Sequence, residues 1–270
     1  MPSLRLTRRR RLAPPYWAVG LAFAGAALFL QLGRWQWHRA AEKRAIAAEF
    51  AAGTAAAATP LGSRSTASLV RYAALVAKGR YDALHQFLLD NVIVDGHVGY
   101  EVLTPLQLED GRWLLVNRGW VALPQGSRTT LPVIGLPSDP TTGPAAGTLR
   151  TFSGRIDELP APALATARTQ PVAFPGTESA ASDHAAGWPR RTSYPASADL
   201  GAALGVTLEP RQLLLAEAEP DGYRRDWKPA SSGFGPERHL AYAFQWWGLG
   251  ALALVLLVVM NLETDEASPR

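Results

Sequence analysis

Two long apolar runs near the ends dominate the hydropathy pattern of this 270-residue chain. The first covers 13–32 and the second 240–260. Neither contains a charged residue, and each contains one strongly polar side chain, Gln31 or Gln245. Each run is about 20 residues long, the length that a helix needs to cross roughly 30 Å of hydrocarbon. The pattern therefore predicts a membrane protein with transmembrane helices at 13–32 and 241–260 around a more polar central segment.

The residues that border both runs favour this interpretation. Trp and Tyr concentrate at membrane–water interfaces, because their rings are apolar and have one polar edge. The bordering aromatic residues are Tyr16, Trp17, Trp35, Trp37, Tyr242, Trp246 and Trp247. Alternatives are buried helices of a soluble protein or, for the first run, a cleaved signal peptide. No small-x-small cleavage site follows Leu32, which favours a retained anchor.

Charge gives the expected orientation. Five arginines and no acidic residue precede the first run, and positive flanks stay in the cytoplasm. We therefore expect 1–12 and the tail 261–270 in the cytoplasm and 33–240 on the exported side. Four basic residues beside the first run oppose this orientation: Arg34, Arg39, Lys43 and Arg44. Segment 33–240 has nearly equal numbers of basic and acidic residues, so the basic pI reflects the N-terminus and does not indicate nucleic-acid binding.

Within the exported segment, the pattern changes from helical to β. The first helix is predicted to continue through Phe50, and 51–68 is an Ala/Gly/Ser/Thr-rich flexible connection. Four segments rich in aliphatic and aromatic residues then follow, with Asp-Gly turn signals at Asp95-Gly96 and Asp110-Gly111. They cover 72–81, 87–94, 100–108 and 113–121. This arrangement predicts a β-meander.

The second half of the exported segment is less regular. Residues 123–195 form a long loop excursion rich in Pro, Gly, Ala, Ser and Thr. A strand is predicted at 147–156, and the rest of the excursion is predicted to have too few packable side chains to build a core. A short helix at 197–204 ends at Gly205, and a strand follows at 211–217. The segment thus predicts one β-rich (α+β) exported domain.

Motifs that carry enzyme chemistry are absent from the sequence. The chain has no cysteine, which excludes disulfides, covalent CxxCH haem attachment and thiolate metal sites. HExxH, GxSxG, P-loop and GxGxxG patterns are missing, and the five histidines are dispersed. We therefore predict a protein that is not an enzyme. Few of its basic residues are lysine, which together with abundant alanine is typical of a high-GC bacterial genome.

The candidate site residues lie where the two runs meet the central segment. On a helix, His239, Tyr242 and Trp246 share one face, and Trp35 and Arg39 follow the first run. An imidazole beside aromatic rings and arginines suits haem, because neutral imidazole binds iron axially and arginines pair with propionates. The alternative is that these residues only anchor helices at the interface and that the histidine is hydrated.

Four blocks of sequence carry a family resemblance. They are Leu32-Gly33-x-Trp35-Gln36-x-x-Arg39-x-x-x-Lys43, Gly99-Tyr100-Glu101-Val102-Leu103-Thr104-Pro105-Leu106, Leu115-Val116-Asn117-Arg118-Gly119-Trp120-Val121 and His239-Leu240-x-Tyr242-Ala243-x-Gln245-Trp246-Trp247. In this order, between two predicted spans, they make the sequence similar to the Surfeit-locus-1 family. That family comprises membrane assembly factors of haem-copper (cytochrome c) oxidase.

The resemblance implies a function in the bacterial plasma (inner) membrane. The expected role is maturation of oxidase subunit I beside other oxidase assembly factors, with haem a as a transient cofactor and His239 as the axial iron ligand. Six further residues of the blocks are expected to contact partners or to be structural: Gln36, Lys43, Asn117, Arg118, Gly119 and Trp120. Alternatives are a cofactor-free scaffold for the nascent oxidase subunit, a membrane-tethered exported enzyme and a two-span sensor.

Overall fold

The computed structural model describes residues 4–7, 10–12, 14–123, 131–132, 134–135, 138–139, 143–144, 147–161, 187–229 and 234–264. The chain divides into two compact units. The helical unit comprises Met1–Ala48 and Pro229–Arg270, and the barrel unit comprises Glu49–Lys228. Much of the excursion predicted at 123–195 lies outside the described residues.

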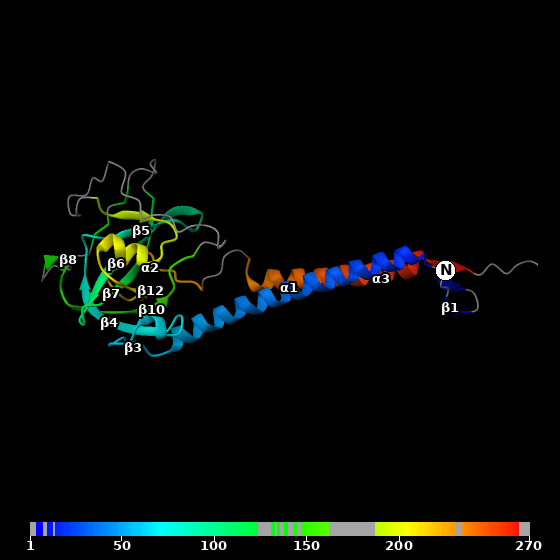
Figure 1. Cartoon of the computed structure of the whole chain (residues 1–270), viewed down its shortest axis with the longest axis horizontal. Helices are drawn as coiled ribbons and strands as arrows, with labels where there is room; N and C mark the ends of the chain where they lie inside the picture. The colour runs from blue at the N-terminus through cyan, green and yellow to red at the C-terminus, as the bar shows by residue number, and fades with distance from the viewer. Residues whose placement is uncertain are drawn as a thin grey trace, which may run out of the picture. The chain divides into compact units, whose positions relative to one another are not determined.

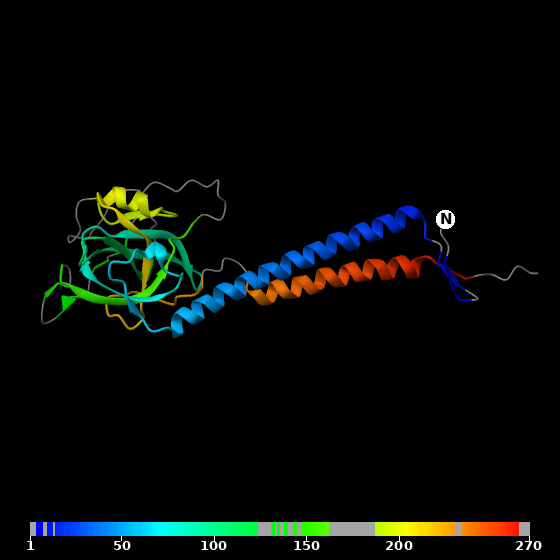
Figure 2. The ribbon, with the colours of Figure 1, turned by 60° about the horizontal axis from the view of Figure 1, so that its bottom comes forward.

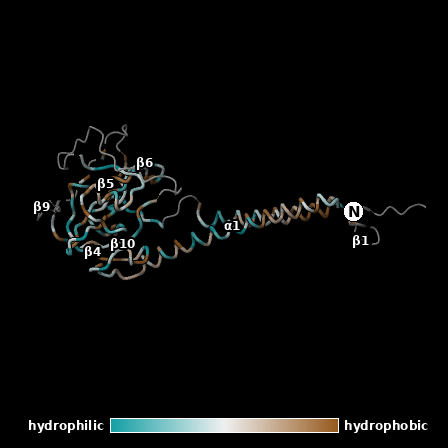
Figure 3. The backbone as a smooth tube through the Cα atoms, in the orientation of Figure 1, coloured by the Kyte–Doolittle hydropathy of each residue, from teal (hydrophilic) through white to brown (hydrophobic). Residues whose placement is uncertain are grey.

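Two long helices form the helical unit. Helix α1 covers Tyr16–Ala55, and its last turns belong to the barrel unit; helix α3 covers Pro236–Met260. The two helices run side by side over the apolar part of α1 (Figures 1 and 2). Both are long and apolar enough to cross a membrane. Only 6% of the most apolar 18-residue segment of α1 and 11% of that of α3 is buried, whereas the core helix of a soluble protein is mostly buried. Figure 3 shows the hydrophobic colour concentrated along this paired length.

The helices approach closely through small residues. Gly250 of α3 lies beside Ala26 and Phe29 of α1, and Ala40 and Ala243 are fully buried. Small side chains at a contact let two helix backbones approach, as in membrane helix pairs. The ring of Phe29 stacks on Trp246 with centroids 5.7 Å apart.

The two ends of the chain meet in a small antiparallel sheet that the hydropathy pattern did not predict. It contains β1 (Leu4–Thr7), β2 (Arg10–Leu12) and β13 (Leu262–Thr264). Leu12 pairs with Leu262, so the residue shortly before α1 lies beside the residue shortly after α3. The paired helices are therefore antiparallel, with β2 and β13 at one end of the pair.

The barrel unit is a closed ring of strands. Its strands are β4 (Ala74–Tyr81), β5 (Phe87–Val94), β6 (His97–Leu108), β7 (Trp113–Ala122), β10 (Arg150–Asp157) and β12 (Leu208–Leu215), with short β3 (Thr59–Pro60) and β11 (Arg190–Thr192) at the edges. The sheet order is β11-β5-β6-β7-β12-β10-β4-β3, and β4 also pairs with β6. Strands β6, β7, β12, β10 and β4 therefore close the ring, and β5 lies beside β6 outside it. The pair β8 (Ser138–Asp139) and β9 (Gly143–Pro144), the 3₁₀ turn η1 (Thr66–Ser68) and helix α2 (Ser197–Leu204) complete the described elements.

The predicted meander is correct for β5, β6 and β7 and wrong for β4. Strand β6 has 12 residues, so it can pair with β5 near its start and with β4 near its end, where Tyr81 lies opposite Leu106. Because β4 pairs with β6 and β10, it does not continue the meander beside β5.

Alternate strand residues point into the ring and form its core. The inner cluster comprises Leu61, Leu75, Ala77, Tyr81, Leu106, Leu108, Leu114, Val116, Phe152, Ile156, Leu213 and Leu215. A second cluster lies under α2 and includes Trp188 and Leu200, and a third includes Ile134. Trp188 and Ile134 come from the stretch predicted to lack enough packable side chains to build a core. Each joins a cluster whose other buried members come from elsewhere in the chain, so this stretch contributes single large side chains to the core.

Candidate functional site

A direct contact joins the two helices at the predicted haem-linked histidine. Nδ1 of His239 in α3 lies 2.6 Å from Oε1 of Gln36 in α1, and both side chains are half-buried. An amide oxygen only accepts hydrogen bonds, so Nδ1 carries a proton, and in the neutral imidazole Nε2 then keeps its lone pair. Among the described residues, Nε2 has no hydrogen-bond partner. It is the ring nitrogen that remains available to a metal.

Tyr242 and Trp246 lie on the same flank of α3 as His239. They follow it by three and seven residues, which returns each close to the same side of a helix. Tyr242 is 40% exposed, and Trp246 is held by its stack on Phe29. An imidazole with one unbonded nitrogen therefore lies at the edge of an apolar, aromatic surface.

Arg39 and Trp35 are less closely associated with His239. Arg39 follows Gln36 by three residues; its Nη1 lies 2.7 Å from Oε2 of Glu42, and both side chains are at least half exposed. Its guanidinium is therefore accessible to another anion. Trp35 lies about 100° around the helix from Gln36, and its side chain is 59% exposed. The structure brings Gln36 to His239 and leaves Trp35 outside this contact.

The opposite flank of the helix pair carries an aromatic cluster that the sequence pattern did not predict. Trp37 of α1 packs against Phe244 and Trp247 of α3, with ring centroids 6.4 and 5.9 Å away. Trp247 fits because Gly33 has no side chain: a Cβ there would lie 2.1 Å from the indole Nε1. The sequence holds one signal for this cluster. Gly33 precedes Trp37 by one helical turn, a spacing that leaves room beside the Trp37 ring for a large side chain of the other helix.

Lys43 holds the segment that leads into α3. Its side chain is buried, and Nζ lies 2.6 Å from the backbone carbonyl of Phe234, just before the N-cap residue Gly235. The guanidinium of Arg238 lies over the ring of Phe234 at 4.8 Å. Lys43 therefore has a structural contact within the helical unit.

The Asn117–Trp120 motif lies in the barrel unit at a β-bulge. Leu103 of β6 faces Asn117 while Glu101 faces Trp120, so β7 has one extra residue here. Gly119 has a φ of +105°, which a side chain would strain. Asn117 donates to Oε2 of Glu101 at 2.7 Å and accepts from the Gly119 amide at 3.1 Å. Burial raises the pKa of Glu101, and the Asn117 hydrogen bond only partly offsets this.

Arg118 and Trp120 bind neighbouring segments of the same unit. The buried Arg118 guanidinium donates to the carbonyls of Asp221 and Gly135 at 2.7 and 2.8 Å, and to Oε1 of Gln86 at 3.1 Å. Burial lowers its pKa. The Trp120 indole donates to the carbonyl of Val92 at 3.1 Å. All four motif residues thus make contacts that stabilise the barrel.

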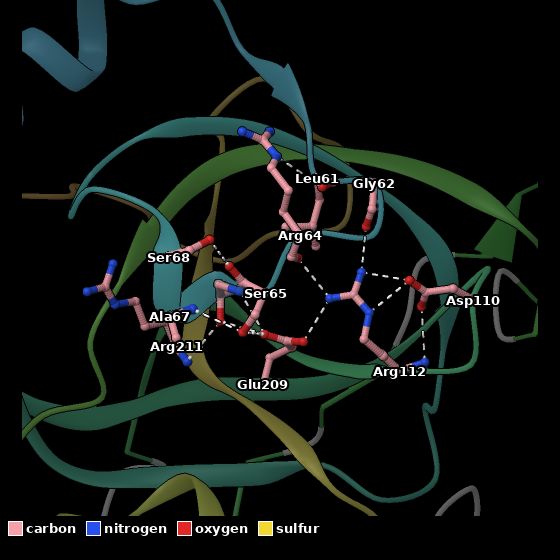
Figure 4. Close-up of polar contacts among 11 residues, drawn as sticks. Leu61, Gly62, Arg64, Ser65, Ala67, Ser68, Asp110, Arg112, Glu209 and Arg211 are labelled. Carbon is pink, nitrogen blue, oxygen red and sulfur yellow. Dashed lines mark hydrogen bonds and ion pairs between the residues drawn. The ribbon is translucent and has the colours of Figure 1, made fainter.

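A network of charged and polar side chains attaches the segment 62–66, which precedes β4, to the ring of strands (Figure 4). Glu209 in β12 accepts from the Thr66 amide at 2.7 Å, from Ser65 Oγ at 2.9 Å and from Arg112 at 2.8 Å. Arg112 also pairs with Asp110 and donates to the Gly62 carbonyl. Burial raises the pKa of Glu209, but these hydrogen bonds outweigh it and the pKa is lowered. The charges satisfy one another, which indicates a structural function for this network.

Among the described residues, the helix pair carries the candidate cofactor site. The described residues contain no group of three or more side chains that could hold a bare metal ion. Haem needs only an axial imidazole, aromatic or apolar contacts and cations for its propionates. His239, Trp246, Tyr242 and Arg39 fit those needs.

Comparisons with known proteins give the family. No curated protein sequence matches the chain. The sequence model of the SURF1 family matches residues 23–251, which include both helices of the helical unit over most of their length and the whole ring of strands. This chain therefore belongs to the SURF1 family.

Proposed function

We propose that this protein is a membrane-anchored assembly factor that binds or delivers haem a during maturation of oxidase subunit I, with His239 as the axial iron ligand. The SURF1 family is associated with cytochrome oxidase assembly and is not a known enzyme family. The observation that carries the haem part is the His239 imidazole, which has Nδ1 bonded to Gln36 and Nε2 unbonded.

The helices support membrane anchoring. Their outward side chains are large and apolar, among them Trp17 at 73% and Leu21 at 67% exposure. Such a surface is stable in hydrocarbon and unfavourable in water. Pairing of Leu12 with Leu262 supports both ends on one side of the bilayer, and the N-terminal arginines favour the cytoplasm. The barrel unit is then extracytoplasmic, at a bacterial plasma membrane.

The residues of one flank account for haem binding. Nε2 of His239 would bind the iron, Tyr242 and Trp246 would contact the macrocycle, and Arg39 would pair with a propionate. When bound, haem a supplies the redox-active iron that the oxidase subunit needs. The chain's own residues hold the group at the membrane surface and limit its contact with water.

Absorption spectra test the proposal. Full-length protein is purified in mild detergent from cells that make haem a and from cells that do not. We expect the haem a spectrum only in the first, and a large loss of bound haem in His239→Ala. His38→Ala is the matched control, because His38 is exposed on α1 and should leave binding unchanged. Colourless wild-type protein, or equal binding by His239→Ala, would reject the haem assignment.

A cofactor-free scaffold is the second candidate. Trp35 and Phe244 are 59% and 61% exposed and could pack against spans of a nascent oxidase subunit. On this reading the protein co-purifies with subunit I, and His239→Ala does not change the yield. Loss of co-purification in His239→Ala, together with loss of haem, favours the haem proposal.

A further inference from the structure

We propose that Gln36 is a positioning residue that fixes the tautomer of His239 and so presents Nε2 as the ligand nitrogen. The contact joins residues 203 positions apart and is 2.6 Å long, short for a neutral hydrogen bond. It lies between helices that both flank the candidate site. The consequence for haem rests on the proposed function, whereas the tautomer does not.

The chemistry of the Gln36 amide decides which ring nitrogen of His239 carries the proton. The oxygen of Gln36 can accept a hydrogen bond and cannot donate one, so the facing Nδ1 has to carry the proton. In a neutral imidazole the other nitrogen is then an acceptor. Which ring nitrogen can bind a metal is set by the hydrogen bond that the other one makes. A histidine without such a partner samples both tautomers.

Close packing on the same stripe of α1 fixes the position of Gln36. Gly33 and Ala40, one turn before and after it, are buried. Ala243 of α3, one turn after His239, is also buried. Because small residues hold the backbones together on either side, Gln36 and His239 can meet without extending into solvent.

A bound iron would respond to Gln36 through the ring. A carbonyl that accepts from Nδ1–H orients the imidazole and raises the basicity of Nε2, and loss of such a partner typically weakens metal binding about 10–100-fold. Gln36→Leu should therefore weaken haem binding by about this factor and raise the reduction potential of the bound haem. Gln36→Glu keeps an acceptor for Nδ1–H, so it should restore binding and lower the potential.

The deciding experiment needs no haem. Full-length protein with ¹⁵N- and ¹³C-labelled histidine is made in cells that lack haem a and is examined by NMR in detergent micelles, in alkaline buffer where imidazoles are neutral. The His239 signals are those lost in His239→Ala. We expect the Nδ1–H tautomer in the wild type and in Gln36→Glu, and a mixture or the Nε2–H tautomer in Gln36→Leu.

Gln31→Leu is the matched control, because Gln31 is an exposed glutamine of the same helix. It should leave the His239 tautomer unchanged, and circular dichroism checks that each variant is helical. Wild-type protein with Nε2–H, or Gln36→Leu with unchanged signals, would overturn the inference. A fixed tautomer in a protein that binds no haem would reject the proposed haem function and leave the role of Gln36 intact.

Discussion

The indole of Trp247 occupies the space that any side chain at Gly33 would need. A Cβ built on Gly33 would lie 2.1 Å from Nε1 and 2.3 Å from Cδ1 of that indole. The absence of a methyl group thus lets α1 and α3 close on the aromatic flank. Gln36 lies one helical turn after Gly33 on the same side of α1. The close approach of the helices at Gly33 therefore also helps Gln36 to reach His239.

Gly33→Ala should destabilise the helix pair by about 1–3 kcal/mol, the usual cost of overpacking. Gly25→Ala is the control, because a Cβ at Gly25 meets nothing within 4 Å. Alanine there should be neutral or stabilise by up to about 1 kcal/mol through helix propensity. Thermal unfolding in detergent, followed by circular dichroism, measures both. Equal stability of Gly33→Ala and the wild type would show that Trp247 moves aside without cost.

Lys43→Met should make the segment that leads into α3, and the first turns of that helix, less stable. The variant keeps the apolar stem and removes the Nζ donor that reaches the Phe234 carbonyl at 2.6 Å. A hydrogen bond from a charged group contributes about 1.5–3 kcal/mol, so the amides of the second turn of α3, the first that donate within the helix, should lose hydrogen-exchange protection by up to that amount.

Arg44→Met is the comparison for Lys43. Arg44 reaches Glu237 at 3.9 Å, but both side chains are at least half exposed. An exposed pair contributes about 0–1 kcal/mol, so exchange should barely change. A similar effect of both variants would contradict the structural role of Lys43.

Arg118→Met should destabilise the barrel unit. It removes the guanidinium that donates to the carbonyls of Asp221 and Gly135 and to Oε1 of Gln86. Oε1 of Gln86 still accepts from Thr104, and the Gly135 carbonyl still accepts from Tyr223, so the buried Asp221 carbonyl is the acceptor that loses its side-chain donor. Leaving a buried acceptor unsatisfied costs about 1–3 kcal/mol, and we expect a loss in this range. Denaturant titration of the full-length protein measures it.

Arg80→Met is the control in the same unit, because Arg80 is exposed on β4. Its effect should stay within about 0.5 kcal/mol. If Arg118→Met folded as stably as Arg80→Met, the motif in β7 would have to be explained by contacts with a partner.

Local signals predicted the elements well. The Asp95-Gly96 pair joins β5 to β6 as a two-residue turn with φ values of +49° and +79°, as a hairpin of this type requires. Gly205 ends α2 with a φ of +72°. The lengths of the two apolar runs also sufficed to predict the long helices, because helix length follows directly from a run of residues.

Long-range pairing could not be predicted in the same way. Strand β12 lies parallel to β7, and β4 closes on β6; neither pairing has a local turn that would encode it. The Gln36–His239 contact depends on the register of two helices separated by the whole barrel unit. Sequence could nominate His239 through a family block and could not show that Gln36 faces it.

Glu209→Gln tests the network of Figure 4 through its pH dependence. Because the folded pKa of Glu209 is lowered from 4.5, the carboxylate stabilises the fold above that ordinary value. This stabilisation is lost as the pH falls through the lower folded pKa. The variant should therefore lose about 1.5–3 kcal/mol at neutral pH and approach the wild type in strong acid. Denaturant titration across pH measures this, and a pH-independent difference would contradict it.

Glu101→Gln should change the stability at neutral pH in the opposite direction, toward a more stable fold. Burial raises the folded pKa of Glu101 above 4.5, so stability falls as the pH rises from that value through the folded pKa. Each unit of elevation costs about 1.4 kcal/mol once the group is ionised. Glutamine keeps an acceptor for Asn117 and has no charge to bury, so the variant should be more stable at neutral pH and similar below the ordinary pKa. Glu109→Gln, half exposed beside Lys78, is the control and should change little. A less stable Glu101→Gln at neutral pH would mean that the carboxylate is stabilised in the folded barrel, contrary to the raised pKa.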